Sequence, residues 1–509
     1  MGVRSKGKKR VFAPKSRSGS LEAEAVEPSH PELVVGIVAA VGTPIDLAVR
    51  LIAQSIESFG YAVETLHLSQ YTDQFKLRNR PPSSPASSAE RIDAMMSRGT
   101  EAREITARDD ILALAAIADI HVRRRGHNAA RSRAAYVLRQ LKHPDETYLL
   151  RETYGEGFLA LGFYSPRVDR ERHLREGGAK ESEIKKLIER DAHEGLDSGQ
   201  RFRDTFHLAD AFVRIGSDSA ACEQELRRIF SLIFGAEIIA PRRDEFGMFQ
   251  AFGAALRSAQ MGRQVGASLL SDLGDVIAVG TNEVPRAGGG SYWEGIDPDV
   301  RDHRRGADSS DEMKSGLVAE VVQRLVAARM LKAKRAGPDV ISRASAALSS
   351  SRLDALIEFG RAVHAEADAI AAAVRLGVST RDADLFCTTF PCHLCAKQII
   401  AAGIGTVTFI EPYPKSLAEE LHRDAICLEE PQEGKVLFKP FVGVAPRRYA
   451  QLFSMLSPAG RVIDRKDKMG KPLDSLFRPR LRMPYFSALE RERLVSEQLG
   501  KITNKKGKS

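Results

Sequence analysis

The sequence predicts an α/β protein with two domains, each built from a sheet covered by helices. The chain has 509 residues, of which 43% are apolar, and this is too long for a single hydrophobic core. Short apolar runs alternate with longer segments of helical periodicity, which is typical of strand–helix–strand units and three-layer domains. Both ends are rich in Gly, Ser and Lys and cannot bury enough apolar surface to fold alone.

We expect domains at residues 31–240 and 241–490, with an insertion at 285–350 and disordered basic tails at 1–30 and 491–509. The net charge of +9 belongs to the two ends. Seven basic residues lie among the first eighteen and four among the last nine, so that the body without these eleven charges carries −2. Such tails contact RNA or DNA nonspecifically, but solubilising ends are the favoured interpretation.

The same composition predicts a cytoplasmic protein without a membrane anchor. No stretch approaches the run of about 20 apolar residues that a membrane helix needs. The first thirty residues lack the apolar centre of a signal peptide. Five cysteines are too few and too unevenly spaced for a disulfide framework, which leaves metal binding or burial as their roles.

The first domain opens with a strand at 32–42, a helix at 44–60 and a second strand at 61–69, a unit that builds parallel sheets. Its other predicted elements are strands at 133–141, 157–165 and 205–215, a loop at 81–90, a helix at 109–120, and a densely charged helical stretch, either a mobile lid or solvated helices, at 167–193.

A glycine turn follows the first strand, as in proteins that hold a phosphate with backbone N–H groups at a helix N-terminus. The pattern departs from G-x-x-x-x-G-K-[ST] in two ways. Five residues separate Gly36 from Gly42, and Thr43 stands where the lysine should be, so the β and γ phosphates lose a point charge. We expect a degenerate P-loop-kinase-like domain used for sensing or assembly, with nucleotide hydrolysis as the alternative.

The second domain reads as helix, hairpin, helix, strand, helix, strand. The predicted elements are a helix at 245–260, a hairpin with strands at 265–271 and 276–283, a helix near 312–334, two helical stretches within 351–377 separated at Gly360, a strand at 383–390, a helix at 392–403 and a strand at 406–412.

Two helix starts in this domain together supply a set of metal ligands. VHAEA places His364 and Glu366 at one start, and PCHLC places Cys392 and Cys395 at the next. Two thiolates and one imidazole make a three-ligand tetrahedral Zn²⁺ site with its fourth position free for water, which is the arrangement of a catalytic site. The ion lowers the pKa of that water toward about 7, and Glu366 is expected to carry its proton to a ring nitrogen and then to a leaving amine.

Each part of this set has a bland alternative, because a lone C-x-x-C is also typical of redox or buried pairs and a lone histidine of a core or surface position. The combined pattern H-x-E … P-C-x-x-C, 28 positions apart, predicts zinc deaminase chemistry. His393 is not expected to be a ligand, since the helix turn points it away. Cys387 is expected in the core, and Cys222 and Cys427 have no predicted role.

With these residues in view, positions 243 to about 455 resemble a cytidine deaminase fold of the deoxycytidylate deaminase type, an α/β/α domain with a mixed sheet between helices. The whole chain without its tails resembles the bacterial anti-phage dCTP deaminases, which deplete the deoxycytidine nucleotide pool during infection. The other stretches that carry the resemblance are RDTFHLAD (203–210), TNEVPRAGGGSYWEG (281–295), EPYPKS (411–416) and PFVGVAPRRY (440–449).

The resemblance implies two substrate contacts. Asn282 matches the asparagine that bonds the sugar in similar deaminases, and Tyr413 matches an aromatic residue near the base and phosphate. A ligand beside the zinc helices would meet strand ends, and a tyrosine ring stacks on a pyrimidine. The alternatives are a turn asparagine and a packed tyrosine.

The leading hypothesis is hydrolytic deamination of dCTP, and also of dCMP, to the uracil nucleotide and ammonia. A base deaminase acting on tRNA or single-stranded DNA shares the core motif, but the near-neutral body argues against it because such enzymes need a basic groove. A third alternative is a nucleotide or RNA sensor with a regulated deaminase output. The resemblance also implies a homo-oligomer and, in some systems, a regulatory partner RNA.

Overall fold

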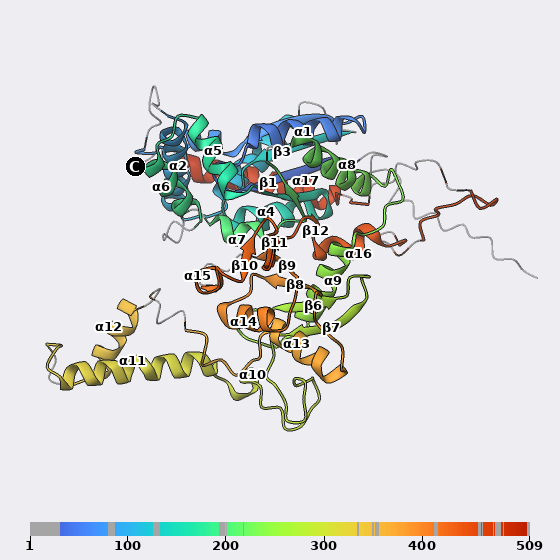
Figure 1. The fold of residues 1–509 in the computed structure, drawn as a ribbon. Coiled ribbons are helices and arrows are strands. Elements are labelled where there is room, and N and C mark those ends of the chain that lie inside the picture. The colour runs from blue at the N-terminus through green and yellow to red at the C-terminus, as the bar shows by residue number, and fades with distance from the viewer. Residues whose placement is uncertain are drawn as a thin grey trace, which may run out of the picture.

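The protein is described by a computed structural model that places most of the chain. The described residues are 31–79, 87–125, 133–192, 201–216, 218–332, 335–348, 356–411, 416–456, 462–471 and 483–505, together with 199, 351, 460, 473, 480 and 481. The tail predicted at 1–30, most of the loop predicted at 81–90, and Tyr413 lie outside them. The described chain forms a mixed α/β protein with two six-stranded sheets (Figure 1).

The first sheet is parallel except at one edge. Its strands, in the order in which they lie side by side, are β12 (Gly443–Val444), β5 (Ala211–Arg214), β4 (Phe158–Tyr164), β1 (Leu33–Ala39), β3 (Ala134–Arg139) and β2 (Ala62–His67). Only β12 runs antiparallel to its neighbour. The strand–helix–strand opening and the strands near 133 and 157 are therefore confirmed.

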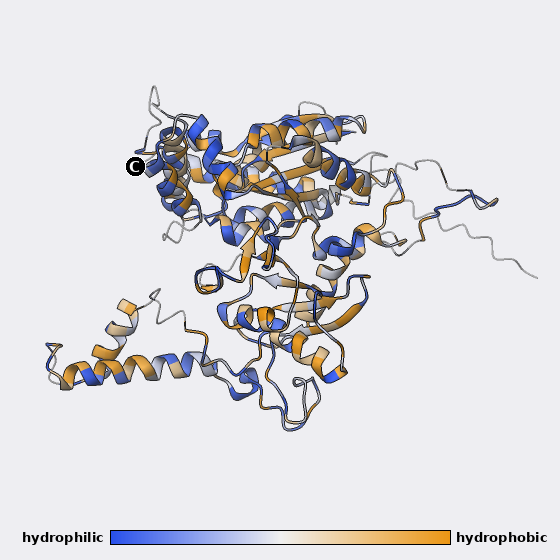
Figure 2. Cartoon of the chain, viewed as in Figure 1, coloured by the Kyte–Doolittle hydropathy of each residue, from blue (hydrophilic) through white to orange (hydrophobic). Residues whose placement is uncertain are grey.

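Helices cover both faces of this sheet because β1 is apolar on both sides. Val35 and Ile37 pack in one cluster with α1 (Ile45–Glu57) and α8 (Ser219–Phe234). Val34 and Val38 belong to the cluster on the opposite face, which includes α3 (Ile111–Arg125), α4 (Pro144–Tyr154) and α17 (Tyr485–Lys505). Figure 2 shows the strands largely in the hydrophobic colour, as expected for a sheet buried between two helical layers.

Two predictions for this part of the chain are wrong. The strand predicted at 205–215 is shorter, because α7 (Phe202–Phe206) takes its first residues and β5 begins only at Ala211. The tail predicted from 491 is ordered through residue 505 as part of α17. In α17, Ala488 and Val495 are buried, and Glu492 is buried in an ion pair with Arg124 of α3.

The second sheet is mixed, and the predicted order of elements in it is confirmed. Its strands lie in the order β10 (Ile426–Leu428), β11 (Val436–Pro440), β9 (Thr406–Glu411), β8 (Asp384–Thr389), β6 (Gly266–Leu270) and β7 (Val276–Thr281). The hairpin β6–β7 is antiparallel, and β8, β9, β11 and β10 are parallel to one another. One face packs against α9 (Arg243–Ala255), and the other carries α13 (Ala365–Leu376) and α14 (His393–Ala401).

The segment before α13 differs from its prediction. Residues 356–363 are not helical, so the stretch 351–377 contributes one described helix rather than two. The reason lies in a tertiary contact, since the backbone N–H of Val363 donates to the carbonyl of Glu283, 3.0 Å away, in a short antiparallel bridge. That bond fixes extended backbone just before His364.

The described part of the insertion contains three helices, α10 (Asp302–Arg305), α11 (Ser309–Ala327) and α12 (Pro338–Leu348). The last two pack on each other and extend away from both sheets as an arm, much of it hydrophobic in Figure 2. Along α12 no residue is buried. No helix among the described residues is both long and apolar enough to cross a membrane.

The chain returns from the second sheet to the first. β12 pairs with β5 of the first sheet, and the carboxylate of Glu245, at the start of α9, accepts a hydrogen bond from the N–H of Val444 at 2.8 Å. The same carboxylate receives two bonds from Arg228 of α8, at 2.8 and 2.7 Å. The expected division at residue 240 is therefore crossed by a shared strand and a buried ion pair.

Candidate metal centre

The first helix start places His364 and Glu366. His364 is the N-cap of α13, with extended backbone (φ −70°, ψ 152°), and Glu366 lies in the first turn. A capping residue leaves the helix axis, so its side chain projects from the helix end rather than from its flank. His364 is part-buried and Glu366 is 4% exposed.

The second helix start places both cysteines. Cys392 is the N-cap of α14 (φ −70°, ψ 167°), and its sulfur accepts a hydrogen bond from the backbone N–H of Cys395, with Sγ and N 3.4 Å apart. This bond is a sulfur version of an N-cap, and it holds both thiols at the same end of the helix. Both residues are buried.

The three side chains converge. The Nδ1 atom of His364 lies 3.2 Å from Sγ of Cys392 and 3.4 Å from Sγ of Cys395, and the three atoms all lie within 4.8 Å of one another. Zinc–sulfur and zinc–nitrogen bonds of about 2.3 and 2.0–2.1 Å in tetrahedral geometry imply a separation of about 3.6 Å between S and N. The donor set and its spacing therefore fit one zinc ion.

A glycine lets the first of these helices approach the sheet. A Cβ atom on Gly280 of β7 would lie 2.1 Å from the carbonyl oxygen of Ala365 and 2.3 Å from the backbone nitrogen of Ala369. Only a residue without a side chain fits there, so Gly280 sets the depth at which α13 lies on the sheet. That depth in turn sets the position of His364.

Residues 241–411 match the family model described as the cytidine and deoxycytidylate deaminase zinc-binding region. This part of the chain is a zinc-binding deaminase region, and zinc is its cofactor. Among curated proteins, ComE operon protein 2 of Bacillus subtilis (strain 168) is 34% identical over 122 residues, which cover 23% of this chain and 63% of the relative. The chain thus spans less than two thirds of that relative's length.

Solved structures with similarity to this chain include a dCMP deaminase from the cyanophage S-TIM5. Its apo form is 17% identical, with 40% of this chain and 99% of that chain covered and a TM-score of 0.22. Its complex with dCMP and dUMP is 18% identical, with coverage of 40% and 98% and a TM-score of 0.23. A bifunctional deaminase/reductase from Thermotoga maritima, a diaminohydroxyphosphoribosylaminopyrimidine deaminase, is 17% identical, with coverage of 47% and 51% and a TM-score of 0.21.

The side chains of His364, Cys392 and Cys395 shift one another's pKa. A hydrogen bond from the thiol of Cys395, reinforced by a bond with His364, holds the pKa of Cys392 below its ordinary value. The bond with Cys392 raises the pKa of His364, and the bond to Cys392 together with burial raises that of Cys395. Cys392 is therefore the thiol that ionises first, and a thiolate is the form that binds a metal.

Glu366 is a buried carboxyl beside the cluster of His364, Cys392 and Cys395. Burial raises its pKa, because the charged form loses its water, and this effect outweighs the attraction of His364. Cys387, expected in the core, is buried and its thiol hydrogen-bonds Glu366. A raised pKa makes the carboxylate of Glu366 a stronger proton acceptor than an ordinary glutamate.

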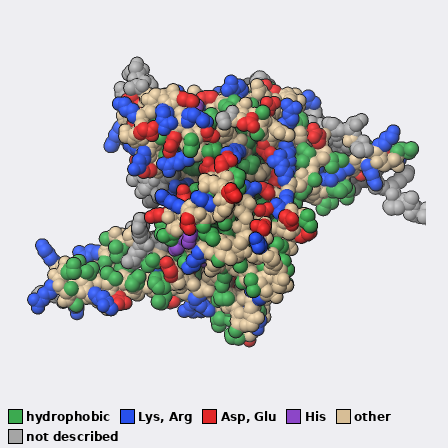
Figure 3. All heavy atoms as spheres, in the orientation of Figure 1, with side chains coloured by type: hydrophobic (Ala, Val, Ile, Leu, Met, Phe, Trp, Pro, Cys, Tyr) green, Lys and Arg blue, Asp and Glu red, His purple; other side chains and the backbone are tan. Residues whose placement is uncertain are grey.

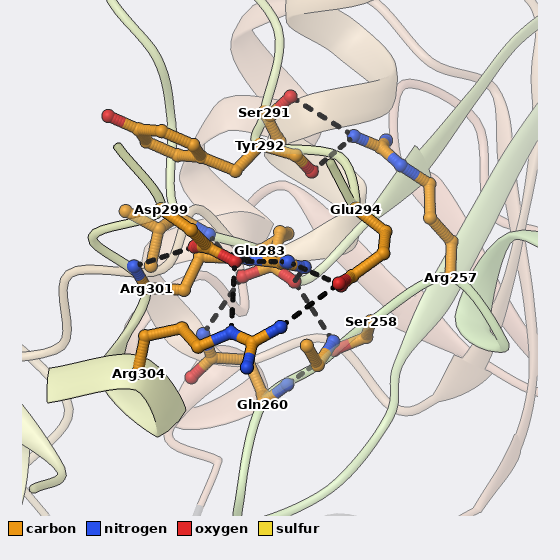
Figure 4. A network of polar contacts seen from close by, with 12 residues as sticks. Arg257, Ser258, Gln260, Glu283, Ser291, Tyr292, Glu294, Asp299, Arg301 and Arg304 are labelled. Carbon is orange, nitrogen blue, oxygen red and sulfur yellow. Dashed lines mark hydrogen bonds and ion pairs between the residues drawn. The ribbon is translucent and has the colours of Figure 1, made fainter. Parts of the chain in front are cut away.

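A buried arginine organises the loop that follows β7, a feature that the sequence did not reveal (Figure 4). The guanidinium of Arg301 lies 2.6 Å from Asp299, 2.9 Å from Glu294 and 3.7 Å from the buried Glu283. The carboxylate of Glu283 also accepts the backbone N–H groups of Ala259 and Val284, at 2.9 and 2.8 Å. The loop from 283 to 301 is thus tied to the end of α9.

This network reaches the cluster of His364, Cys392 and Cys395 through the segment before α13. Arg361 donates to the carbonyl of Val300 at 2.9 Å and to Asp302 at 3.0 Å. Two residues later, Val363 bonds the backbone of Glu283. His364 is therefore held from the loop side as well as by its helix.

Asn282 lies at the end of β7, where this loop begins, and its side-chain amide is hydrogen-bonded to backbone groups. Its Oδ1 accepts from the N–H of Val265 at 2.7 Å, and its Nδ2 donates to the carbonyl of Arg263 at 2.8 Å. Among the described residues it thus acts as a clamp on the chain before β6. Tyr413 lies outside the described residues.

His393, Cys222, Cys427 and Trp293 all lie among the described residues. His393 lies 3.9 Å from Glu358, and the described metal-ligand group does not include it. Cys222 is buried among α8 and the first sheet, and the thiol of Cys427 donates to the carbonyl of Val436 at 3.6 Å. All five cysteines are free. The only tryptophan, Trp293, is 59% exposed and carries the guanidinium of Arg257 over its ring, 3.7 Å from the ring centre.

Proposed function

We propose that the chain is a zinc-dependent hydrolase that deaminates deoxycytidine nucleotides, dCTP and also dCMP, to dUTP or dUMP and ammonia. The observation that carries this proposal is the convergence of one imidazole and two thiols beside a buried glutamate within a zinc-binding deaminase region. That set supplies both a metal site and a proton carrier, which hydrolytic deamination needs together.

The proposed roles follow from the positions of the side chains. His364, Cys392 and Cys395 would hold the ion, which when bound supplies Lewis-acid activation of water. Glu366 takes one proton from the attacking water and delivers it to N3 of the cytosine as oxygen adds to C4. It then carries a second proton to the exocyclic nitrogen, the C4–N4 bond breaks, and ammonia leaves as the carbonyl forms.

The charge of the folded body favours a nucleotide over a nucleic-acid strand. The body is near neutral in sequence, and acidic and basic side chains are interspersed over the upper part of the face seen in Figure 3. Enzymes that act on a strand need a basic groove along it. Asn282 as a sugar contact and Tyr413 as a base or phosphate contact belong to this proposal, and Asn282 would have to release one of its backbone bonds to bind the sugar.

The proposed biological role is depletion of deoxycytidine nucleotides in anti-phage defence, with regulation by a partner such as RNA. The support is the resemblance of the sequence from the glycine turn to PFVGVAPRRY. We also propose that the enzyme is a homo-oligomer, for which the hydrophobic and largely exposed arm of α11 and α12 is a suitable surface.

A substrate panel tests the proposal. Zinc-loaded protein is incubated separately with dCTP, dCMP, CTP, tRNA and single-stranded DNA, and products are followed by chromatography. We expect turnover of the free deoxycytidine nucleotides and its loss in Glu366→Ala with zinc content unchanged. Turnover of a polymer without turnover of free nucleotides would refute the substrate, and activity surviving in Glu366→Ala would refute the role of the glutamate.

A further inference from the structure

A large cavity opens at the carboxyl edge of the first sheet, far in sequence from the zinc ligands. Its volume is about 860 Å³, and its lining includes the residues that follow β1, β2 and β3. Ligands of parallel α/β sheets bind at this edge, and pockets for small molecules commonly measure about 300–1,000 Å³. The glycine turn after β1, with Gly42 and Thr43, forms part of the wall.

A carboxylate from a distant helix occupies the place where such a turn holds a phosphate. Asp191 of α6 (Glu181–Ala192) is 1% exposed, and its Oδ2 accepts the backbone N–H of Val41 at 2.7 Å. Its Oδ1 accepts from Nζ of Lys142 at 2.6 Å. A backbone N–H of the turn and a lysine ammonium are the two kinds of donor that a P-loop offers to phosphate oxygens.

Lys142 supplies the charge that the turn itself lacks. It follows β3 rather than lying in the turn, and its ammonium also donates to the carbonyl of Ala39 at 2.8 Å, at the end of β1. Lys142, which follows the neighbouring strand β3, therefore supplies the ammonium group that a P-loop has at the position of Thr43. Arg91, Arg139 and His173 add basic groups to the cavity lining, and Asp46, Glu146 and Glu176 add acidic ones.

Thr43 is an independent sign of a ligand. It is 5% exposed and lines the cavity, yet its hydroxyl is buried without a hydrogen-bond partner among the described residues. A buried hydroxyl without a partner costs free energy, and a ligand oxygen in the cavity would supply the partner that the hydroxyl of Thr43 lacks. The apolar wall, which includes Leu68, Met95 and Leu112, is suited to a base or another flat group.

We propose that this cavity binds a nucleoside polyphosphate, with Lys142 as the phosphate-binding lysine and Asp191 as an internal carboxylate that holds the phosphate position until the ligand displaces it. Asp191 lies on the second of two charged helices, α5 (Arg167–Glu176) and α6, and α5 also packs on the turn. A Cβ on Gly42 would lie 2.7 Å from the carbonyl of Arg170. Binding therefore releases α6 from the turn and converts ligand occupancy into movement of the two helices.

Calorimetry on the full-length protein with ATP and magnesium, and with pyrophosphate, tests the proposal. Asp191→Asn removes the competing charge and should tighten binding about tenfold, whereas Lys142→Gln should weaken it by a similar factor, in line with one charge-assisted hydrogen bond each. Lys186→Gln is the matched control, because it removes an exposed ion pair of α6 with Asp93 outside the cavity. Glu366→Ala should leave binding unchanged, which separates this site from the zinc centre.

Thr43→Val keeps the test decisive if a charged variant fails to fold. It removes a hydroxyl without a partner, so the melting temperature of the free protein should not fall, while affinity for the probe should. The proposal is overturned if neither probe binds wild type or Asp191→Asn at millimolar concentration. It is equally overturned if a folded Asp191→Asn binds no tighter than wild type, or if Thr43→Val binds as wild type does.

Discussion

Asp210→Asn should weaken the contact between the two halves of the chain more than any single surface change. Asp210 precedes β5 and is fully buried, with 0% exposure. Its Oδ1 lies 3.0 Å from Nη2 of Arg151, 3.1 Å from Nε of Arg448 and 3.6 Å from Nε of Arg447, and its Oδ2 accepts the N–H of Ala160 at 2.8 Å. Two of these arginines come from the segment that follows β12.

The size of the expected loss in stability follows from the contacts that an asparagine amide can retain at position 210. Asparagine offers one acceptor oxygen and no charge, so it can retain the bond from Ala160 or one guanidinium contact. At about 1.5–3 kcal/mol for each hydrogen bond to a charged group, losing two of them costs about 3–6 kcal/mol. Breaking a buried ion pair from one side costs about 3–5 kcal/mol. We therefore expect the free energy of unfolding to fall by about 3–5 kcal/mol at pH 7.

The loss should depend on pH. Burial alone would raise the pKa of Asp210, but Arg448 and Arg151 outweigh it and hold that pKa below its ordinary range. A depressed carboxyl pKa adds stability that is complete above the unfolded value of about 3.9 and disappears as the pH falls through the folded value. The difference between wild type and Asp210→Asn should accordingly be largest near neutral pH and shrink below about pH 4.

Urea unfolding followed by circular dichroism at several pH values measures both effects. Asp204→Asn is the matched control, because Asp204 lies in the same segment but makes an exposed pair with Arg201, and it should change stability by no more than about 0.5 kcal/mol. A loss below about 1 kcal/mol for Asp210→Asn, or a loss equal at pH 7 and pH 3.5, would contradict the reasoning.

Three further outcomes are expected. Cys392→Ala should lose zinc and fold stability, measured as metal content and melting temperature, and full zinc occupancy would contradict its role as a ligand. Glu366→Ala should lower turnover about 10²–10⁴-fold at unchanged zinc content. Gly280→Ala should displace α13 and lower both the melting temperature and the affinity for zinc. The control is Gly253→Ala, which should be neutral or slightly stabilising because a Cβ atom there would meet no atom within 4 Å. Equal effects of the two substitutions would refute the close-packing argument.

The cluster of His364, Cys392 and Cys395 could be predicted from sequence because each half of the set is local. Two residues at one helix start, His364 and Glu366, and two at the next, Cys392 and Cys395, have positions fixed by their own helix ends. The sheet then brings the two starts together. The ion-pair network around Arg301 could not be predicted in this way. Its partners Glu283, Glu294 and Asp299 lie in irregular backbone, where neither period of apolar residues gives a signal.

Tertiary contacts also explain the errors at element and domain boundaries. Residues 356–363 have helical spacing but form irregular backbone, and the bond between Val363 and Glu283 holds the end of this segment in a short bridge. Residues from 491 look like a basic tail by charge, but the buried Val495 and Glu492 belong to a helix that covers α3. In both cases the deciding partner is more than 75 residues away in the chain.

The return of the chain to its first sheet has a consequence for synthesis. β5 gains its outer neighbour only when residues 443–444 exist, and α3 gains its cover of α17 only when residues up to 505 exist. During translation the first half therefore exposes the edge of β5 and the apolar face of α3 until the later residues are synthesised. Exposed strand edges and apolar surfaces promote the aggregation of incomplete chains. The first half can therefore complete its sheet and its helical cover only after the second half has been synthesised.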